Sequence, residues 1–145
     1  MSESVQMYLV TIARLRQGDQ PVPLSLLAEA LAVSPVSVNE MCRKLQDQGL
    51  LIYTPYKGVV LTNKGETRAC YILRRHRLWE VFLFDKLGIA FDQAHDIACQ
   101  LEHATPNELA DQLDLYLNYP PVNPLGEPIP RCDVQPPAAP TVALA

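Results

Sequence analysis

The first predicted element is an amphipathic helix over residues 3–17. Its apolar side chains recur at the three- and four-residue spacing that puts them on one face of a helix, at Val5, Tyr8, Leu9, Ile12 and Leu15. Gly18 follows and ends the helix, since glycine readily adopts the backbone conformation found after helices. The chain therefore opens with a helix that packs one face against a core.

Two further helices follow with a short connection between them. Pro23 opens the second, and Ser34-Pro35 opens the third, because serine is a good N-cap and proline suits the first helical position. The third helix ends at Gly49 and exposes a polar side made of Ser37, Asn39, Glu40, Arg43 and Lys44. This order is typical of a helix-turn-helix motif.

A β-hairpin is expected next, from two short β-rich runs at residues 50–53 and 59–61. The connection between them places Lys57 at a basic tip. A hairpin directly after a helix-turn-helix is the winged-helix layout, in which one helix enters the major groove of DNA. The predicted DNA-contacting residues are Ser34, Ser37, Asn39, Glu40, Arg43, Lys44 and Lys57.

The second half of the chain is predicted to be helical up to Tyr119. A long helix capped by Thr62 or Asn63 runs to Gly88, Asp92 caps the next, and the capping box of residues 105–108 opens the last. Eight of the 13 prolines lie in the final 27 residues, so an extended, mobile tail is expected there.

The fold class expected is mostly α, a winged helix-turn-helix with a small hairpin wing followed by an all-helical domain. The predicted boundaries are 1–73 for the DNA-binding domain, 74–119 for a metal-binding and dimerisation domain, and 120–145 for the proline-rich tail.

Composition points to a cytoplasmic protein. Apolar residues make up 48% of the chain, but no run reaches the roughly 18 residues that a membrane span needs, and no signal-peptide pattern opens it. The four cysteines (Cys42, Cys70, Cys99, Cys132) lack CxxC spacing, so free thiols are expected rather than disulfides, with one of them a possible ligand.

Charge is distributed unevenly along the chain, although the net charge is −4. Residues 1–86 hold 11 Lys/Arg against 8 Asp/Glu, and residues 87–145 hold 1 against 8. Between residues 43 and 77 the count is 8 basic to 2 acidic. A local basic field of this kind suits contacts with DNA phosphates, although a merely solvated basic face is the alternative.

All three histidines, His76, His95 and His103, fall within 28 residues. At about 100° per residue, His95, Cys99, Glu102 and His103 share one stripe of a helix, and His76 and Glu80 are one turn apart on the preceding helix. Imidazole, thiolate and carboxylate at such spacing can meet at one metal ion. The alternative is a set of surface polar groups with weak helix-pair interactions.

These residues resemble the diphtheria toxin repressor family of iron- and manganese-dependent regulators. The resemblance is most specific at residues 7–12 (MYLVTI), 75–80 (RHRLWE), 95–103 (HDIACQLEH) and 123–130 (NPLGEPIP). It implies a primary metal site of Met7, Cys99, Glu102 and His103, and an ancillary site of His76, Glu80 and His95.

The chain differs from each branch of that family. Longer iron-responsive members continue into an SH3-like third domain, which lends ligands to the ancillary site. Short manganese-responsive members have acidic residues where this chain has Met7, Val10 and Cys99. Soft donors favour Fe²⁺ as the cofactor, with Mn²⁺ as the alternative and other divalent transition metals binding in vitro.

The sequence therefore predicts a homodimeric repressor of metal-homeostasis genes that binds double-stranded operator DNA when loaded with ferrous iron. Three alternatives remain open. One is a manganese-responsive regulator of the same family, and another is a winged-helix regulator not gated by metal. An enzyme is the third and is not expected, because no nucleophile motif, phosphate loop or HExxH occurs.

Overall fold

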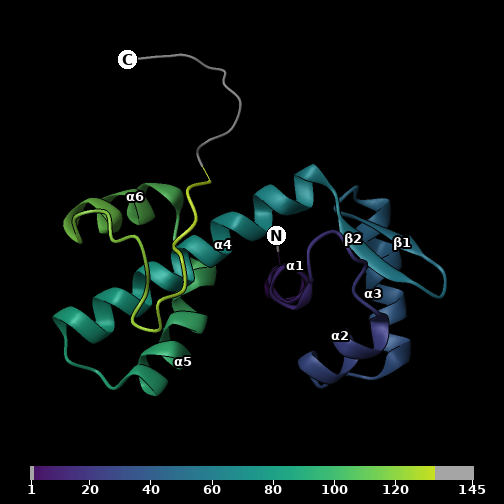
Figure 1. The fold of residues 1–145 in the computed structure, drawn as a ribbon, viewed down its shortest axis with the longest axis horizontal. Coiled ribbons are helices and arrows are strands. Elements are labelled where there is room, and N and C mark those ends of the chain that lie inside the picture. Colours follow the sequence, from purple (N-terminus) through teal and green to yellow (C-terminus); the bar gives the residue numbers. More distant parts are fainter. Residues whose placement is uncertain (1, 133–145) are drawn as a thin grey trace, which may run out of the picture. The chain divides into compact units, whose positions relative to one another are not determined.

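The computed structural model describes residues 2–132, which fall into two compact units on either side of the boundary between Ala69 and Cys70 (Figure 1). Each unit is described by itself. The expected fold class is confirmed, since helices make up both units and the one sheet among the described residues is a two-stranded hairpin. None of the described helices is long and apolar enough to cross a membrane.

The N-terminal unit contains three helices, a hairpin and the start of a fourth helix. In chain order these are α1 (Glu3–Leu15), α2 (Leu24–Leu31), α3 (Pro35–Asp47), β1 (Leu51–Thr54), β2 (Gly58–Leu61) and α4 (Asn63–Val81). The two strands are antiparallel, with Leu51 opposite Leu61 and Thr54 opposite Gly58. This is the predicted order of a winged helix-turn-helix.

Side-chain caps fix where these helices begin. The Ser34 hydroxyl accepts a hydrogen bond from Ser37 N at 3.1 Å, and Pro35 takes the first helical position. Thr62 Oγ1 accepts from Gly65 N at 3.1 Å, so Thr62 caps α4. Both predicted caps are confirmed, because each follows from a local pattern of three or four residues.

One apolar core holds the N-terminal unit together. Leu9 and Ile12 of α1, Leu27 of α2, Leu45 of α3 and Val59 of β2 are each at most 1% exposed and pack in a single cluster. The alternating burial of the strands turns Ile52 and Val60 outward. Burying such side chains stabilises the unit by about 1.5–3 kcal/mol each.

The C-terminal unit begins within α4, which ends in a π-helical turn at Phe82–Lys86. It continues with α5 (Phe91–Leu101), a 3₁₀ turn at Glu102–Ala104, and α6 (Asn107–Tyr116). Its core is formed by side chains from α4, α6 and the segment after α6, namely Leu78, Val81, Ala110, Leu113, Leu117 and Ile129.

Two predicted caps in this unit are wrong. Helix α5 begins at Phe91, with Ala90 at the cap position, and the Asp92 carboxylate accepts only from the N–H of the next residue, Gln93. The capping box of residues 105–108 does not form either, because Pro106 caps α6 without a side-chain bond. The Thr105 hydroxyl has other partners, accepting from Trp79 Nε1 and donating to Leu101 O.

The expectation of an extended, mobile tail from residue 120 onward is wrong for residues 120–132. Ile129 is 4% exposed within the core, and Arg77 donates to the carbonyl of Pro128 at 2.7 Å. We call residues 120–132 the strap, because they pack back onto α4 and α6. The rest of the predicted tail, residues 133–145, lies outside the described residues.

The expectation of four free thiols is also wrong, because Cys70 and Cys132 form a disulfide that joins α4 to the end of the strap. The pairing spans 62 residues, so no local spacing signals it. Cys42, buried in the N-terminal unit, and Cys99, on α5, are free.

Gly65 lies where the first turn of α4 approaches the backbone of Leu50, the residue just before β1. A Cβ added there would lie 2.0 Å from the carbonyl oxygen of Leu50. We expect Gly65→Ala to lower the free energy of unfolding by about 1–3 kcal/mol, since backbone must move to relieve the contact. Urea denaturation followed by circular dichroism measures this. The exposed Thr67→Ala serves as control, and equal stability of both variants would contradict the expected clash.

Candidate metal centre and DNA-binding surface

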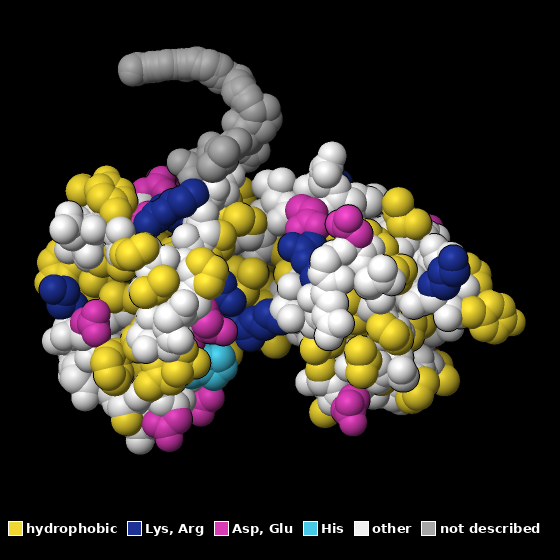
Figure 2. All heavy atoms as spheres, viewed as in Figure 1, with side chains coloured by type: hydrophobic (Ala, Val, Ile, Leu, Met, Phe, Trp, Pro, Cys, Tyr) yellow, Lys and Arg dark blue, Asp and Glu magenta, His cyan; other side chains and the backbone are white. Residues whose placement is uncertain are grey.

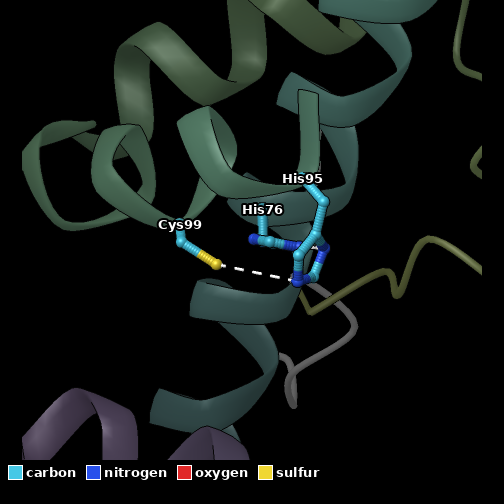
Figure 3. A group of neighbouring side chains, drawn as sticks. All are labelled: His76, His95 and Cys99. Atoms are coloured by element: carbon cyan, nitrogen blue, oxygen red, sulfur yellow. Dashed lines mark hydrogen bonds between the residues drawn. The ribbon is translucent and has the colours of Figure 1, made fainter. Parts of the chain in front are cut away.

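Helices α4 and α5 contribute the side chains of the candidate metal centre. On α4, His76 and Glu80 are one helical turn apart, and each is only 1% exposed. On α5, His95 and Cys99 are likewise one turn apart and are partly exposed. Figure 3 shows the imidazoles of His76 and His95 side by side, with the Cys99 sulfur pointing toward them.

The His76 imidazole lies between two carboxylates. Its Nδ1 is 2.7 Å from Oε1 of Glu102, and its Nε2 is 2.9 Å from Oε2 of Glu80. Burial lowers the pKa of His76, but hydrogen bonds with Cys99, Glu102 and Glu80 outweigh burial and raise that pKa to about 11. The raised pKa favours the imidazolium form of His76 between the two carboxylates.

Both oxygens of the Glu80 carboxylate have partners. Oε2 contacts His76 and also lies 2.7 Å from Nδ1 of His95, while Oε1 accepts from Nδ2 of Asn123 at 2.8 Å. Burial raises the pKa of Glu80, but His76, His95 and Asn123 together lower it to about 2. Glu80 is thus a buried carboxylate that stays ionised at neutral pH.

Glu102 and His103 come from the 3₁₀ turn that follows α5. Glu102 is 2% exposed, and its Oε2 lies 3.4 Å from Nε2 of His103. This turn is fixed to α4, because Trp79 Nε1 donates to Thr105 Oγ1 at 2.8 Å just beyond it. The turn thereby brings Glu102 to the imidazole of His76.

Six of the seven predicted metal ligands form one network. Ligand atoms of His76, His95 and Cys99 all lie within 4.8 Å of one another, and Cys99 Sγ is 3.9 Å from His95 Nε2. The His76–Glu102 contact joins a residue predicted for the ancillary site to one predicted for the primary site. The seventh, Met7, lies half-buried on α1 in the N-terminal unit, and its role as a ligand stays a prediction.

The chemistry of this donor set fits a divalent transition metal. Imidazole, thiolate and carboxylate are its usual protein ligands. Two carboxylates that are at most 2% exposed are costly to bury unless cations neutralise them. The alternative of weakly interacting surface groups therefore does not hold for His76, Glu80 and Glu102. Figure 2 shows that histidine atoms reach the surface of this unit beside acidic side chains, so the network is open to solvent on one side.

Asn123 is a further residue of the metal centre, outside the ligand set that the sequence predicts. Its side chain is 3% exposed and donates to Glu80. The available signal was the stretch Asn123-Pro-Leu-Gly, because asparagine before a turn bonds to the backbone ahead of it and is held in place.

The predicted DNA-contacting residues lie on α3 and on the wing of the N-terminal unit. Six of the seven are exposed, and the seventh, Asn39, is half-buried. Lys57 follows the wing turn, in which Lys57 N donates to Thr54 O at 3.0 Å. Tyr56 at the tip is fully exposed and has a positive φ of 69°. The geometry of the α3 face and of the hairpin suits the major groove and the adjacent backbone.

Comparison with known proteins identifies both units. Residues 1–59 match the model of the iron dependent repressor N-terminal DNA binding domain, and residues 62–131 match that of the iron dependent repressor metal binding and dimerisation domain. A helix-turn-helix transcriptional regulator of Methanocaldococcus jannaschii is 35% identical over 118 residues, which are 81% of this chain and 94% of that protein.

Longer members of the family are also similar. The diphtheria toxin repressor of Corynebacterium diphtheriae is 30% identical over 131 residues, which are 90% of this chain but 58% of that repressor. The solved structure of a manganese-dependent transcriptional repressor in complex with manganese is 40% identical, with a TM-score of 0.80, over 94% of this chain and 63% of that one. The chain thus spans little more than half of these longer relatives. It belongs to the iron-dependent repressor family, whose members are transcriptional regulators rather than enzymes, and it contains the family's DNA-binding domain and its metal-binding and dimerisation domain.

Proposed function

We propose that this chain is a divalent-metal-activated, sequence-specific transcriptional repressor of metal-homeostasis genes, and that ferrous iron is its signal. The observation that supports this most strongly is the buried network of His76, Glu80 and Glu102, extended by His95 and Cys99, in a chain that also contains a winged helix. A regulator of chromosomal genes of this kind acts in the cytoplasm.

The proposed ligands divide into the two sites that the resemblance implies. Cys99, Glu102 and His103, with Met7 from α1, form the primary site, and His76, Glu80 and His95 form the ancillary one. The 2.7 Å contact between His76 and Glu102 supports a coupling of the two sites, because binding or loss of a proton or a metal ion at one of these side chains changes the electrostatic environment of the other.

Metal gating follows from how these donors are distributed. A bound divalent ion supplies positive charge and coordination bonds to several elements at once. The donors belong to α1, α4, α5 and the 3₁₀ turn, so one arrangement of these elements is favoured over the others. Moving a two-state equilibrium from 1:99 to 99:1 requires about 5.5 kcal/mol of differential affinity.

We infer that operator DNA is bound by a symmetric homodimer. Apolar side chains remain exposed on the π-helical turn, just after it and on α6, at Phe84, Leu87, Leu109, Leu115 and Tyr116. An isologous contact through this surface would give the dimer two α3 helices, one for each half of a two-fold symmetric operator.

A manganese-responsive regulator is the second candidate. The similarity to a manganese-dependent repressor over 94% of this chain favours it. Against it stand Met7 and Cys99, since manganese prefers carboxylate, carbonyl and water oxygens to sulfur.

The decisive experiment measures operator binding by fluorescence anisotropy, with DNA selected in vitro, in ferrous iron and in chelator. We expect chelation to weaken binding by about 5- to 150-fold, the usual range of allosteric coupling. Glu102→Ala should abolish the metal response, because Glu102 is buried against His76 and His103. His95→Ala should only weaken it, since His95 is partly exposed.

The exposed Asp96→Ala on α5 is the matched control and should respond as the wild type does. Circular dichroism establishes that each variant folds. Equal DNA affinity with and without chelator in the wild type would refute metal gating, and an unaltered response of Glu102→Ala would refute the ligand assignment.

DNA binding should depend steeply on salt, because each phosphate neutralised by a basic side chain releases counterions. Lys57→Ala at the wing should weaken binding by a similar factor on all sequences and reduce the salt slope by about one. Asn39→Ala on α3 should instead change which bases are preferred. If Lys57→Ala altered base preference alone, the wing would not act as proposed.

The choice of metal is tested by activation of DNA binding at equal site occupancy, because raw affinity follows the general divalent order. We expect ferrous iron to activate more strongly than manganese. The double variant Met7→Asp/Cys99→Glu supplies hard oxygen donors and should shift the iron-to-manganese ratio toward manganese. Gln100→Glu, which adds a charge at an exposed position of α5, is the control. An unchanged ratio in the double variant would show that other residues select the metal.

A further inference from the structure

The strap, residues 120–132, is fixed to the C-terminal unit at several points. Cys132 is disulfide-bonded to Cys70, Arg131 pairs with the buried carboxylate of Asp114, and Ile129 lies in the core. Such a segment presents its side chains to the rest of the unit in a fixed geometry. One of them, Asn123, reaches the metal centre.

Every polar group of the Asn123 side chain is satisfied. Its Oδ1 accepts from the backbone N–H groups of Leu125 and Glu127 at 3.1 and 2.8 Å. Its Nδ2 donates to Oε1 of Glu80 and to Oε1 of Glu127, at 2.8 Å each. The two acceptor bonds determine which way the amide faces, and its N–H donors are thereby directed at Glu80.

This contact divides the two oxygens of Glu80 between different tasks. Oε1 is held by Asn123, and Oε2 faces His76 and His95. A carboxylate held through one oxygen has less rotational freedom to lose when the other oxygen binds a cation. Groups that orient metal ligands in this way commonly contribute about 10- to 100-fold to metal affinity.

We propose that Asn123 is a positioning residue for Glu80 in the metal centre. The proposal rests on the metal-binding function given above, and it assigns to the strap a part in metal binding. The competing explanation is that Asn123 only shapes the turn at residues 123–127. The two roles use different atoms, since the turn needs Oδ1 and the orientation of Glu80 needs Nδ2.

Asn123→Ser separates the two roles. Serine keeps an oxygen that can accept from the backbone ahead of it, but it has no amide that reaches Glu80. We expect affinity of the full-length protein for cobalt(II), titrated alone, to fall by about 10- to 100-fold, with an altered cobalt absorption spectrum. Glu127→Gln is the matched control, because it changes the other acceptor of Nδ2 and leaves the bond to Glu80 in place; we expect its affinity to change by less than about twofold.

Wild-type affinity and spectrum in a folded Asn123→Ser variant would overturn the proposal. If that variant does not fold, Asn123→Asp has the same shape, keeps both backbone bonds and removes the donor, and wild-type cobalt binding by it overturns the proposal equally. Glu80→Gln distinguishes the two levels of inference. If Glu80→Gln weakens cobalt binding and Asn123→Ser does not, only the positioning role is refuted. If neither change affects cobalt binding, the assignment of Glu80 as a ligand is refuted as well.

Discussion

The buried imidazole of His76 lies between the carboxylates of Glu80 and Glu102, and much of the C-terminal unit is arranged around that contact. Removing one partner of a buried ion pair costs about 3–5 kcal/mol, so each element must deliver its charge to the right place. Helix α4 supplies two members one turn apart. The 3₁₀ turn after α5 supplies the third member, Glu102. The strap supplies Asn123, which donates to Oε1 of Glu80, the oxygen that neither imidazole contacts.

Elements that depend on neighbouring residues could be predicted from the sequence. Helices α1 and α3 and the hairpin follow from the local spacing of apolar residues along the chain. The Ser34 cap follows from a pattern of four consecutive residues. The i, i+4 pairs on α4 and α5 were visible for the same reason. Helix geometry alone puts His76 beside Glu80, whatever the rest of the chain does.

Contacts between distant segments could not be predicted in this way. The pairing of Cys70 with Cys132, the bond from Asn123 to Glu80 and the approach of Glu102 to His76 join residues 62, 43 and 26 positions apart. The prolines of residues 120–132 predict flexibility, yet proline also fits a segment whose hydrogen bonds go to other elements rather than to a regular strand ladder. Asp92 does not cap α5 because the helix already begins at Phe91, and Thr105 does not cap α6 because its hydroxyl bonds to Trp79 and Leu101.

The disulfide closes a covalent ring from Cys70 to Cys132. Six of the proposed metal ligands and Asn123 lie within this ring, and Met7 alone lies outside it. A single peptide-bond cleavage anywhere inside the ring therefore leaves the two pieces joined, with His76, Glu102 and the strap still on one molecule. Under oxidising conditions these residues lie within one covalently closed ring, and a protease would have to cut the ring twice to release any part of it.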